Sequence, residues 1–188
     1  MSAAEGHPGH VVLVGMMGSG KTTIGRLLAG ALGRPFFDSD EMVVARTGHS
    51  VAELFEASGE SGFRAEEAAA LADGLADPVP SVIAAAGGTV LDPTNRRLIR
   101  QAGAEGGLVV WLHTDVAVLA ERVVTGTHRP LLADDPQANL ERLAAVREPL
   151  YAEVADLRIE SDEAPDALVV RLVDAVGGSS VAAGHQQP

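Results

Sequence analysis

The sequence contains no cysteine, and this absence excludes several classes of protein. Without cysteine there is neither a disulfide framework nor a thiolate metal site. Aromatic residues make up only 3% of the chain, so alanine, valine and leucine must supply most of any buried core. At 188 residues the chain is long enough to bury such a core, and we expect residues 1–188 to form a single domain.

The chain also lacks long apolar runs and an excess of positive charge. No apolar stretch approaches the roughly 18 residues that suggest a membrane span, and residues 1–10 lack the charged-then-apolar order of a signal peptide. The net charge of −12 argues against broad binding to nucleic acid or to anionic membranes. We therefore expect a cytoplasmic protein, a monomer, that binds neither nucleic acid nor membrane. A few arginines in one cleft of such an acidic molecule would suit a small anionic ligand.

Lysine is almost absent, and the single lysine stands in the most informative stretch of the sequence. An apolar run, Val11 to Val14, stops at Gly15, and Gly20-Lys21-Thr22 follows after four residues. This is the G-x-x-x-x-G-K-[ST] pattern of a phosphate loop between a buried strand and a helix. The glycines allow backbone N–H groups to surround a phosphate, and a helix N-terminus favours an anion. We expect nucleotide contacts from Gly18, Ser19, Gly20, Lys21, Thr22 and Thr23, with the lysine on the β- and γ-phosphates and the Thr22 hydroxyl on Mg²⁺.

The rest of the chain alternates between buried runs and helical periodicity. Strands are predicted at 11–14, 36–40, 81–86, 108–112 and 157–160. Helices are predicted at 22–32, 41–48, 63–76, 93–102, 115–124, 137–152 and 165–176, with a further short one that begins in a Ser50–Glu53 capping box. This alternation predicts an α/β fold, in which helices cover both faces of a parallel sheet. Residues 125–137 are predicted to be a mobile loop, and 177–188 a disordered tail.

Two acids, Asp38 and Asp40, follow the second predicted strand. In parallel sheets ligands bind at the carboxyl ends of the strands, and a spacing of two on an extended segment points both side chains the same way. One carboxylate can then help to hold Mg²⁺, and the other can accept a proton from an attacking hydroxyl. The same acids could instead only cap the helix that begins near Glu41. The spacing alone favours neither interpretation.

Three arginines and a glycine pair each allow a functional and a structural interpretation. Arg64 and Arg147 can bind an anionic group or lie on a helix surface, and Arg129 can close over phosphates or remain solvated in its loop. Gly87-Gly88 follow a strand, where their backbone N–H groups can approach a ligand or simply form a tight turn.

In this order and spacing, the motifs make the chain resemble a shikimate kinase of the nucleoside-monophosphate-kinase-like group. The similarity runs from about Val11 to Val173. It is carried by Gly15 to Thr22, Asp38-Ser39-Asp40, Gly59-Glu60 with Phe63-Arg64, Gly87-Gly88, Arg129-Pro130-Leu131-Leu132, and Arg147 with Pro149-Leu150-Tyr151. The resemblance implies a three-layer P-loop kinase fold around a five-stranded parallel sheet, with a core at about 10–176. It also implies acceptor-binding helices at about 41–76 and a mobile lid at about 123–137.

The resemblance further implies transfer of the γ-phosphate of ATP to the 3-hydroxyl of shikimate, with Mg²⁺ as cofactor. Asp40 would bind the shikimate hydroxyls and act as catalytic base, together with Lys21 and Arg129 as the other catalytic residues. Thr22 and Asp38 would bind the metal. On the acceptor side, Arg64 and Arg147 would clamp the shikimate carboxylate, Glu67 would orient Arg64, and Gly87 and Gly88 would line the site. On the nucleotide side, Arg122 would stack on adenine and Arg129 would close on the phosphates.

One residue departs from the family pattern, which usually has three glycines after the third strand. Here the first of them is Ala86. Alanine would strain the backbone if that position needed a positive φ, and would cost little if it only had to be small. Two other functions stay open: a kinase for another polyol acid, such as gluconate or a cyclitol, and a binding-only regulator. Retention of the phosphate loop with Asp40 and Arg129 argues against the regulator.

Overall fold

The computed structural model describes residues 9–124 and 135–183. Within these ranges the chain forms one five-stranded sheet in the order β2-β3-β1-β4-β5, and all neighbouring strands are parallel. The strands are β1 Val11–Val14, β2 Phe36–Asp38, β3 Val82–Ala84, β4 Leu108–His113 and β5 Leu157–Glu160. Because the strands are parallel, their carboxyl ends meet at one edge of the sheet. The predicted α/β fold with a five-stranded parallel sheet is confirmed.

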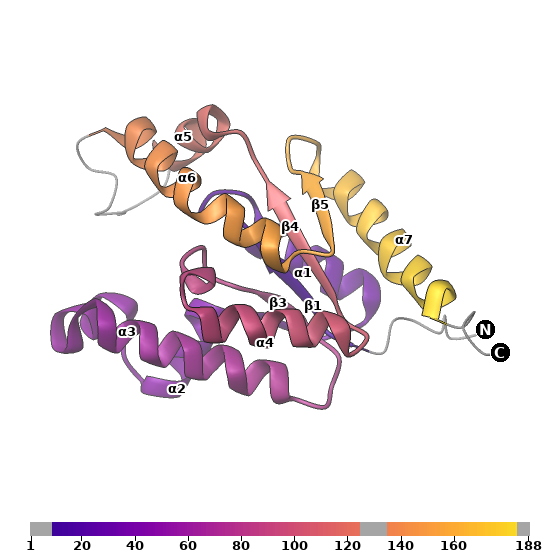
Figure 1. Ribbon diagram of the computed structural model, residues 1–188, viewed down its shortest axis with the longest axis horizontal. Coiled ribbons are helices and arrows are strands. Elements are labelled where there is room, and N and C mark those ends of the chain that lie inside the picture. The colour runs from indigo at the N-terminus through magenta and orange to yellow at the C-terminus, as the bar shows by residue number, and fades with distance from the viewer. Residues whose placement is uncertain (1–8, 125–134, 184–188) are drawn as a thin grey trace.

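The central strand β1 explains why the sheet carries helices on both faces. Val11 and Leu13 contact a core that includes α1 (Lys21–Leu32) and α7 (Pro165–Ala183). Val12 and Val14 contact the opposite core, which includes α4 (Pro93–Ala104), α5 (Val116–Val124) and α6 (Pro136–Val154). Successive side chains of a strand point to opposite faces, so a continuous apolar run fits a strand that is buried on both. Figure 1 looks onto the second face, with α4 and α6 in front of the strands and α1 behind them.

Two further helices, α2 (Ser39–Thr47) and α3 (Val51–Ala76), pack on each other at one side of the molecule (Figure 1). They share a small apolar core of Val43, Leu54, Phe63 and Ala70. The predicted capping box is present, because Ser50 and Glu53 each accept from the other's backbone N–H. The expected break between the short helix and the following one is present inside α3, at Gly59, where φ is 68° and ψ is −174°; the second helix therefore starts before residue 63. A positive φ costs little at a residue without a Cβ, so the chain bends there and resumes the helix.

Two boundaries near the predicted lid and tail also differ from expectation. The helix α5 ends at Val124 and α6 begins at Pro136. The lid predicted at 123–137 therefore overlaps the end of α5 and the start of α6. Residues 125–134, including Arg129, lie outside the described residues. The last helix continues to Ala183, and the disordered tail expected from 177 is therefore wrong for 177–183. An established helix propagates with one hydrogen bond per added residue, and no proline stops it here; residues 184–188 again lie outside the described part. No helix in the described ranges is long and apolar enough to cross a membrane.

Candidate active site

Three neighbouring strands bring the predicted functional segments to the same edge of the sheet. The strand β2 leads into Asp38 and Asp40, β3 leads into the turn Ala86–Gly88, and β1 leads into the phosphate loop, Gly15–Thr22. Neighbouring strands lie about 4.8 Å apart, so three adjacent strand ends fall within about 10 Å. Segments far apart in the sequence therefore meet at one place, the edge where parallel sheets bind their ligands.

The phosphate loop has the backbone that its glycines predict. At Gly15, φ is 144°, and a Cβ there would lie 2.4 Å from the carbonyl oxygen of Leu112. Gly20, with φ of 92°, stands at the N-cap of α1. The Lys21 Nζ atom donates to the carbonyl oxygens of Gly15 and Met16, each at 2.8 Å. The ammonium group is thus held against the loop that would bind the phosphates.

The other predicted nucleotide contacts surround this loop. Gly18 also has a positive φ, Ser19 is fully buried, and Thr23 is exposed in the first turn of α1. Arg122, on α5, donates from Nη1 to the Gly18 carbonyl at 3.3 Å and from Nη2 to the Ser161 carbonyl at 3.1 Å. Its guanidinium therefore joins the phosphate loop to the segment that follows β5.

Asp38 and Asp40 differ in environment, and one sequence expectation about them is wrong. The strand ends at Asp38, whose Oδ1 accepts from the Asp40 backbone N–H at 3.1 Å and so caps α2. Its Oδ2 accepts from the Thr22 hydroxyl at 2.7 Å. Asp40 lies in the first turn of α2 with an exposed side chain, so the two acids do not extend from one strand in the same direction. The capping interpretation holds for Asp38, because the carboxylate starts the helix two residues earlier than expected.

The contact between Thr22 and Asp38 fits a magnesium site. A hydroxyl and a carboxylate are the oxygen ligands that Mg²⁺ uses beside phosphate oxygens and water, and it does not require a cage made only of protein. In the described ranges no group of three or more His, Cys, Asp or Glu residues is placed to hold a metal. The Thr22–Asp38 pair, next to the phosphate loop, is therefore where the structure offers such ligands.

Arg64 and Arg147 approach the Ala86–Gly88 turn from different helices. A Cβ on Gly88 would lie 2.6 Å from Nη1 of Arg64, and a Cβ on Gly87 would lie 3.5 Å from Nη1 of Arg147. Neither glycine has a positive φ, so space rather than backbone strain limits a side chain here: a Cβ on Gly88 would displace the end of Arg64, and a Cβ on Gly87 would lie 3.3 Å from the Gly15 carbonyl oxygen. The structure thus gathers two guanidinium groups at one turn of an acidic protein. Planar, forked donors of this kind match a carboxylate.

Arg64 is fixed in place by a buried carboxylate. Its Nη1 lies 2.7 Å from Oε2 of Glu67, a side chain that is 0% exposed. Burial raises the pKa of Glu67 above its usual range, and the Arg64 guanidinium opposes that rise. The charge of Asp40 adds to the rise, which shows that Asp40 lies within electrostatic reach of this ion pair. The structure therefore brings Asp40, Arg64, Gly87, Gly88 and Arg147 together.

The raised pKa of Glu67 predicts a pH-dependent stability. The folded protein holds this proton more tightly than the unfolded chain, so the Glu67 contribution to the free energy of unfolding falls as pH rises from the ordinary pKa of 4.5 through the folded value. The variant Glu67→Gln lacks this titration. Its free energy of unfolding should therefore increase relative to that of the wild type as pH rises across that interval. Urea unfolding of both proteins from about pH 4 to about pH 7 measures the difference, and a constant difference would contradict the raised pKa.

Two buried hydroxyl groups that the sequence analysis left without a role contact the same turn. The Ser39 Oγ atom accepts from the Ala86 N–H at 2.8 Å, and the Tyr151 hydroxyl donates to the Gly87 carbonyl at 2.6 Å. Both side chains are 0% exposed. The sequence did contain a signal for the tyrosine, because it stands four residues after Arg147 and so on the same face of a helix.

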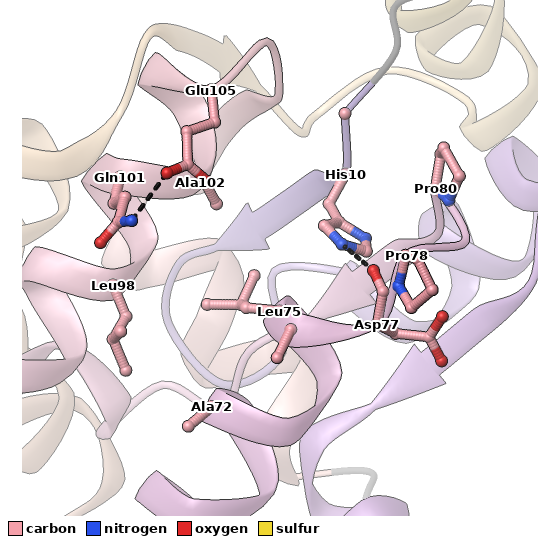
Figure 2. A pocket seen from close by; sticks show the side chains of 12 residues that line it. His10, Ala72, Leu75, Asp77, Pro78, Pro80, Leu98, Gln101, Ala102 and Glu105 are labelled. Atoms are coloured by element: carbon pink, nitrogen blue, oxygen red, sulfur yellow. Dashed lines mark hydrogen bonds between the residues drawn. The ribbon is translucent and has the colours of Figure 1, made fainter.

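Two hollows in the described part of the structure lie at opposite edges of the sheet. One of about 500 Å³ lies at the turn and is lined by Arg64, Glu67 and Gly88 among others. The other, of about 370 Å³, lies at the amino ends of the strands (Figure 2), where His10 bonds to the Asp77 carbonyl at 3.0 Å. Ligands of parallel sheets bind at the carboxyl ends, so only the first hollow belongs to the candidate active site.

Comparisons with known proteins agree with this geometry. The family model for shikimate kinase matches residues 17–176. The shikimate kinase of Halorhodospira halophila is 47% identical over 173 residues, which cover 91% of this chain and 95% of that protein. A shikimate kinase from Acinetobacter baumannii, solved in complex with shikimate, is similar in structure with a TM-score of 0.83 at 34% identity, covering 95% of this chain and 96% of that one. A gluconokinase from Sinorhizobium meliloti gives a TM-score of 0.64 at 25% identity, covering 94% and 99%.

The sequence comparisons and the structure comparison support the same assignment. The family model runs from inside the phosphate loop into α7, and the similar proteins cover more than nine tenths of the chain. The fold is accordingly the three-layer P-loop kinase fold of these structures. The chain belongs to the shikimate kinase family.

Proposed function

We propose that the protein transfers the γ-phosphoryl group of ATP to the 3-hydroxyl of shikimate, giving shikimate 3-phosphate and ADP. The observation that carries this proposal is the approach of Arg64 and Arg147 to one turn on the strand next to the phosphate loop. Two guanidinium groups would hold the carboxylate of an acceptor there, with its hydroxyls directed at the bound nucleotide. Membership of the shikimate kinase family supports the same acceptor.

The proposed mechanism assigns the chemistry to the residues that meet at this edge. The phosphate loop and Lys21 hold the β- and γ-phosphates, and Arg122 packs on the adenine. Asp40 accepts the proton of the acceptor hydroxyl. At the same time the hydroxyl oxygen forms a bond to the γ-phosphorus, and the bond between that phosphorus and the β–γ bridging oxygen breaks. Thr22 and Asp38 would hold Mg²⁺, which offsets negative charge on the phosphates.

The proposal also covers segments and properties that complete the enzyme. The helices α2 and α3 would form the acceptor-binding subdomain, and residues 123–137 would close as a lid and bring Arg129 to the phosphates. Closure of this kind excludes water, which would otherwise hydrolyse ATP. The protein would act as a monomer in the cytoplasm, and its net charge of −12 argues against nucleic acid or an anionic membrane as a partner.

A gluconate kinase is the second candidate, because a gluconokinase has the same fold over 94% of this chain. One assay separates the candidates: ADP release from MgATP with shikimate, with gluconate, or with no acceptor. Release that depends on shikimate is the expected result. Release with gluconate alone would assign the other acceptor, and ATP binding without release would favour a binding-only regulator. Removal of Mg²⁺ with EDTA should stop the reaction, and added Mg²⁺ should restore it.

A further inference from the structure

Tyr151 is the only tyrosine in the sequence, and its position poses a question that core packing does not answer. The ring lies in the core beside Trp111, with the two ring centroids 5.9 Å apart, and the side chain is 0% exposed. A phenylalanine would fill the same space without burying a hydroxyl group. Because a buried hydroxyl costs free energy unless it is hydrogen-bonded, its partner should indicate what it does.

The hydroxyl lies where three parts of the active site meet. It donates to the Gly87 carbonyl at 2.6 Å, and its oxygen lies 3.8 Å from the sulfur of Met16 in the phosphate loop. The guanidinium of Arg147, one helical turn earlier on α6, interacts with the same oxygen. Burial raises the pKa of Tyr151, so the group remains a protonated donor at neutral pH. Its single proton is thus committed to the Gly87 carbonyl.

This hydrogen bond holds a residue that has no side chain of its own to anchor it. At its start the turn is held by Ser39, which accepts from the Ala86 N–H. At Gly87, the Tyr151 hydroxyl is the side-chain anchor that the described residues provide. The carbonyl that it binds belongs to the residue beside Nη1 of Arg147. One turn of helix α6 therefore supplies both a guanidinium at the site and the bond that fixes the backbone next to it.

We propose that Tyr151 is a positioning residue for the acceptor. Its hydroxyl fixes the position of the Gly87 backbone relative to the Arg147 guanidinium, and so shapes the binding site of the acceptor carboxylate. This inference rests on the proposed function and assigns the acceptor side of that site. Without the hydroxyl the Gly87 carbonyl loses its donor, and the turn shifts relative to the helix. The phosphate loop would lose only the long contact with the Met16 sulfur and would keep its hydrogen bonds from Lys21, so we expect little change in nucleotide binding.

The test is Tyr151→Phe, which keeps the ring and removes only the hydroxyl. We expect the KM for the acceptor to rise about tenfold, while the KM for ATP stays within about twofold. Tyr151→Leu removes the ring as well and should give a similar rise in acceptor KM despite a larger loss of stability. Ile159→Val is the matched control: it lies in the core on the other face of the sheet, and its modest loss of stability should leave both KM values unchanged.

Each outcome bears on the proposal. An acceptor KM in Tyr151→Phe that changes by less than about twofold, an equal rise in both KM values, or the same rise in Ile159→Val would overturn it. If the acceptor KM rose in proportion to the fall in melting temperature across the three variants, the role of Tyr151 would be merely structural. That result would overturn the proposal as well. The assay uses whichever acceptor the wild-type protein phosphorylates. Failure of the proposed function is therefore seen in the wild type alone, whereas failure of this inference is seen in the ratio of variant to wild type.

Discussion

Asp40→Asn is expected to lower kcat about a thousandfold and to leave ATP affinity nearly unchanged. Asparagine is the same size but cannot accept the proton of the attacking hydroxyl. The fold should tolerate the change, since the Asp40 side chain is exposed in the first turn of α2, where an acid at the helix N-terminus has a modest favourable effect. Acceptor-dependent ADP release measures kcat, and calorimetry of nucleotide binding measures the affinity.

The neighbouring acid provides the matched control for this experiment. Glu41 lies in the same first turn of α2, and its carboxylate forms an ion pair with Arg26. Glu41→Gln removes the same charge from the same turn and should keep kcat within about threefold of the wild type. If Asp40→Asn lost ATP binding together with turnover, the residue would be structural. If both variants lost activity equally, the effect would come from the charge at the helix start rather than from a base.

Arg147→Ala should raise the acceptor KM about a hundredfold with little change in the KM for ATP. The side chain is 5% exposed, and among the described residues its Nε finds no hydrogen-bond partner. A buried, charged donor without a partner is unfavourable, and an acceptor carboxylate would satisfy it. Initial rates at varied acceptor, then at varied ATP, give the two constants.

Another arginine on the same helix tests whether position matters more than charge. Arg142 is exposed on α6 and bonds to Asn139 on the helix surface. Arg142→Ala should leave both KM values within about twofold of the wild type. A comparable rise in acceptor KM in the two variants would contradict the proposed carboxylate contact. An equal rise in the acceptor and ATP KM values for Arg147→Ala would contradict it too.

The sequence was most informative where a short motif determines its own structure. The phosphate loop was predictable because its glycines, lysine and following helix form one local unit, and the strands at 11–14 and 157–160 were predicted with the observed bounds. Asp40 was misplaced because one carboxylate, that of Asp38, both ends a strand and begins a helix. A local competition of this kind is decided by tertiary contacts, here with Thr22, which period and propensity do not describe.

The acceptor side of the site was less predictable because it is built from long-range contacts. Arg64 and Arg147 were both identified, but no distance between residues 83 positions apart can be read from a sequence; the roles assigned to them stay predictions. The surroundings of Ala86 likewise became visible only in three dimensions, and its effect on the acceptor stays a prediction. Its N–H binds Ser39, which any residue other than proline could do, whereas the crowded position at the turn is Gly88.

The lysine of the phosphate loop has a consequence for chemical labelling. Its ammonium group is bound to two backbone carbonyls, and every other strongly basic side chain in the sequence is an arginine. Acylating reagents modify lysine amines and leave guanidinium groups intact. Lys21 is therefore the one side-chain amine in the sequence, and its rate of acylation reports on how accessible the phosphate loop is.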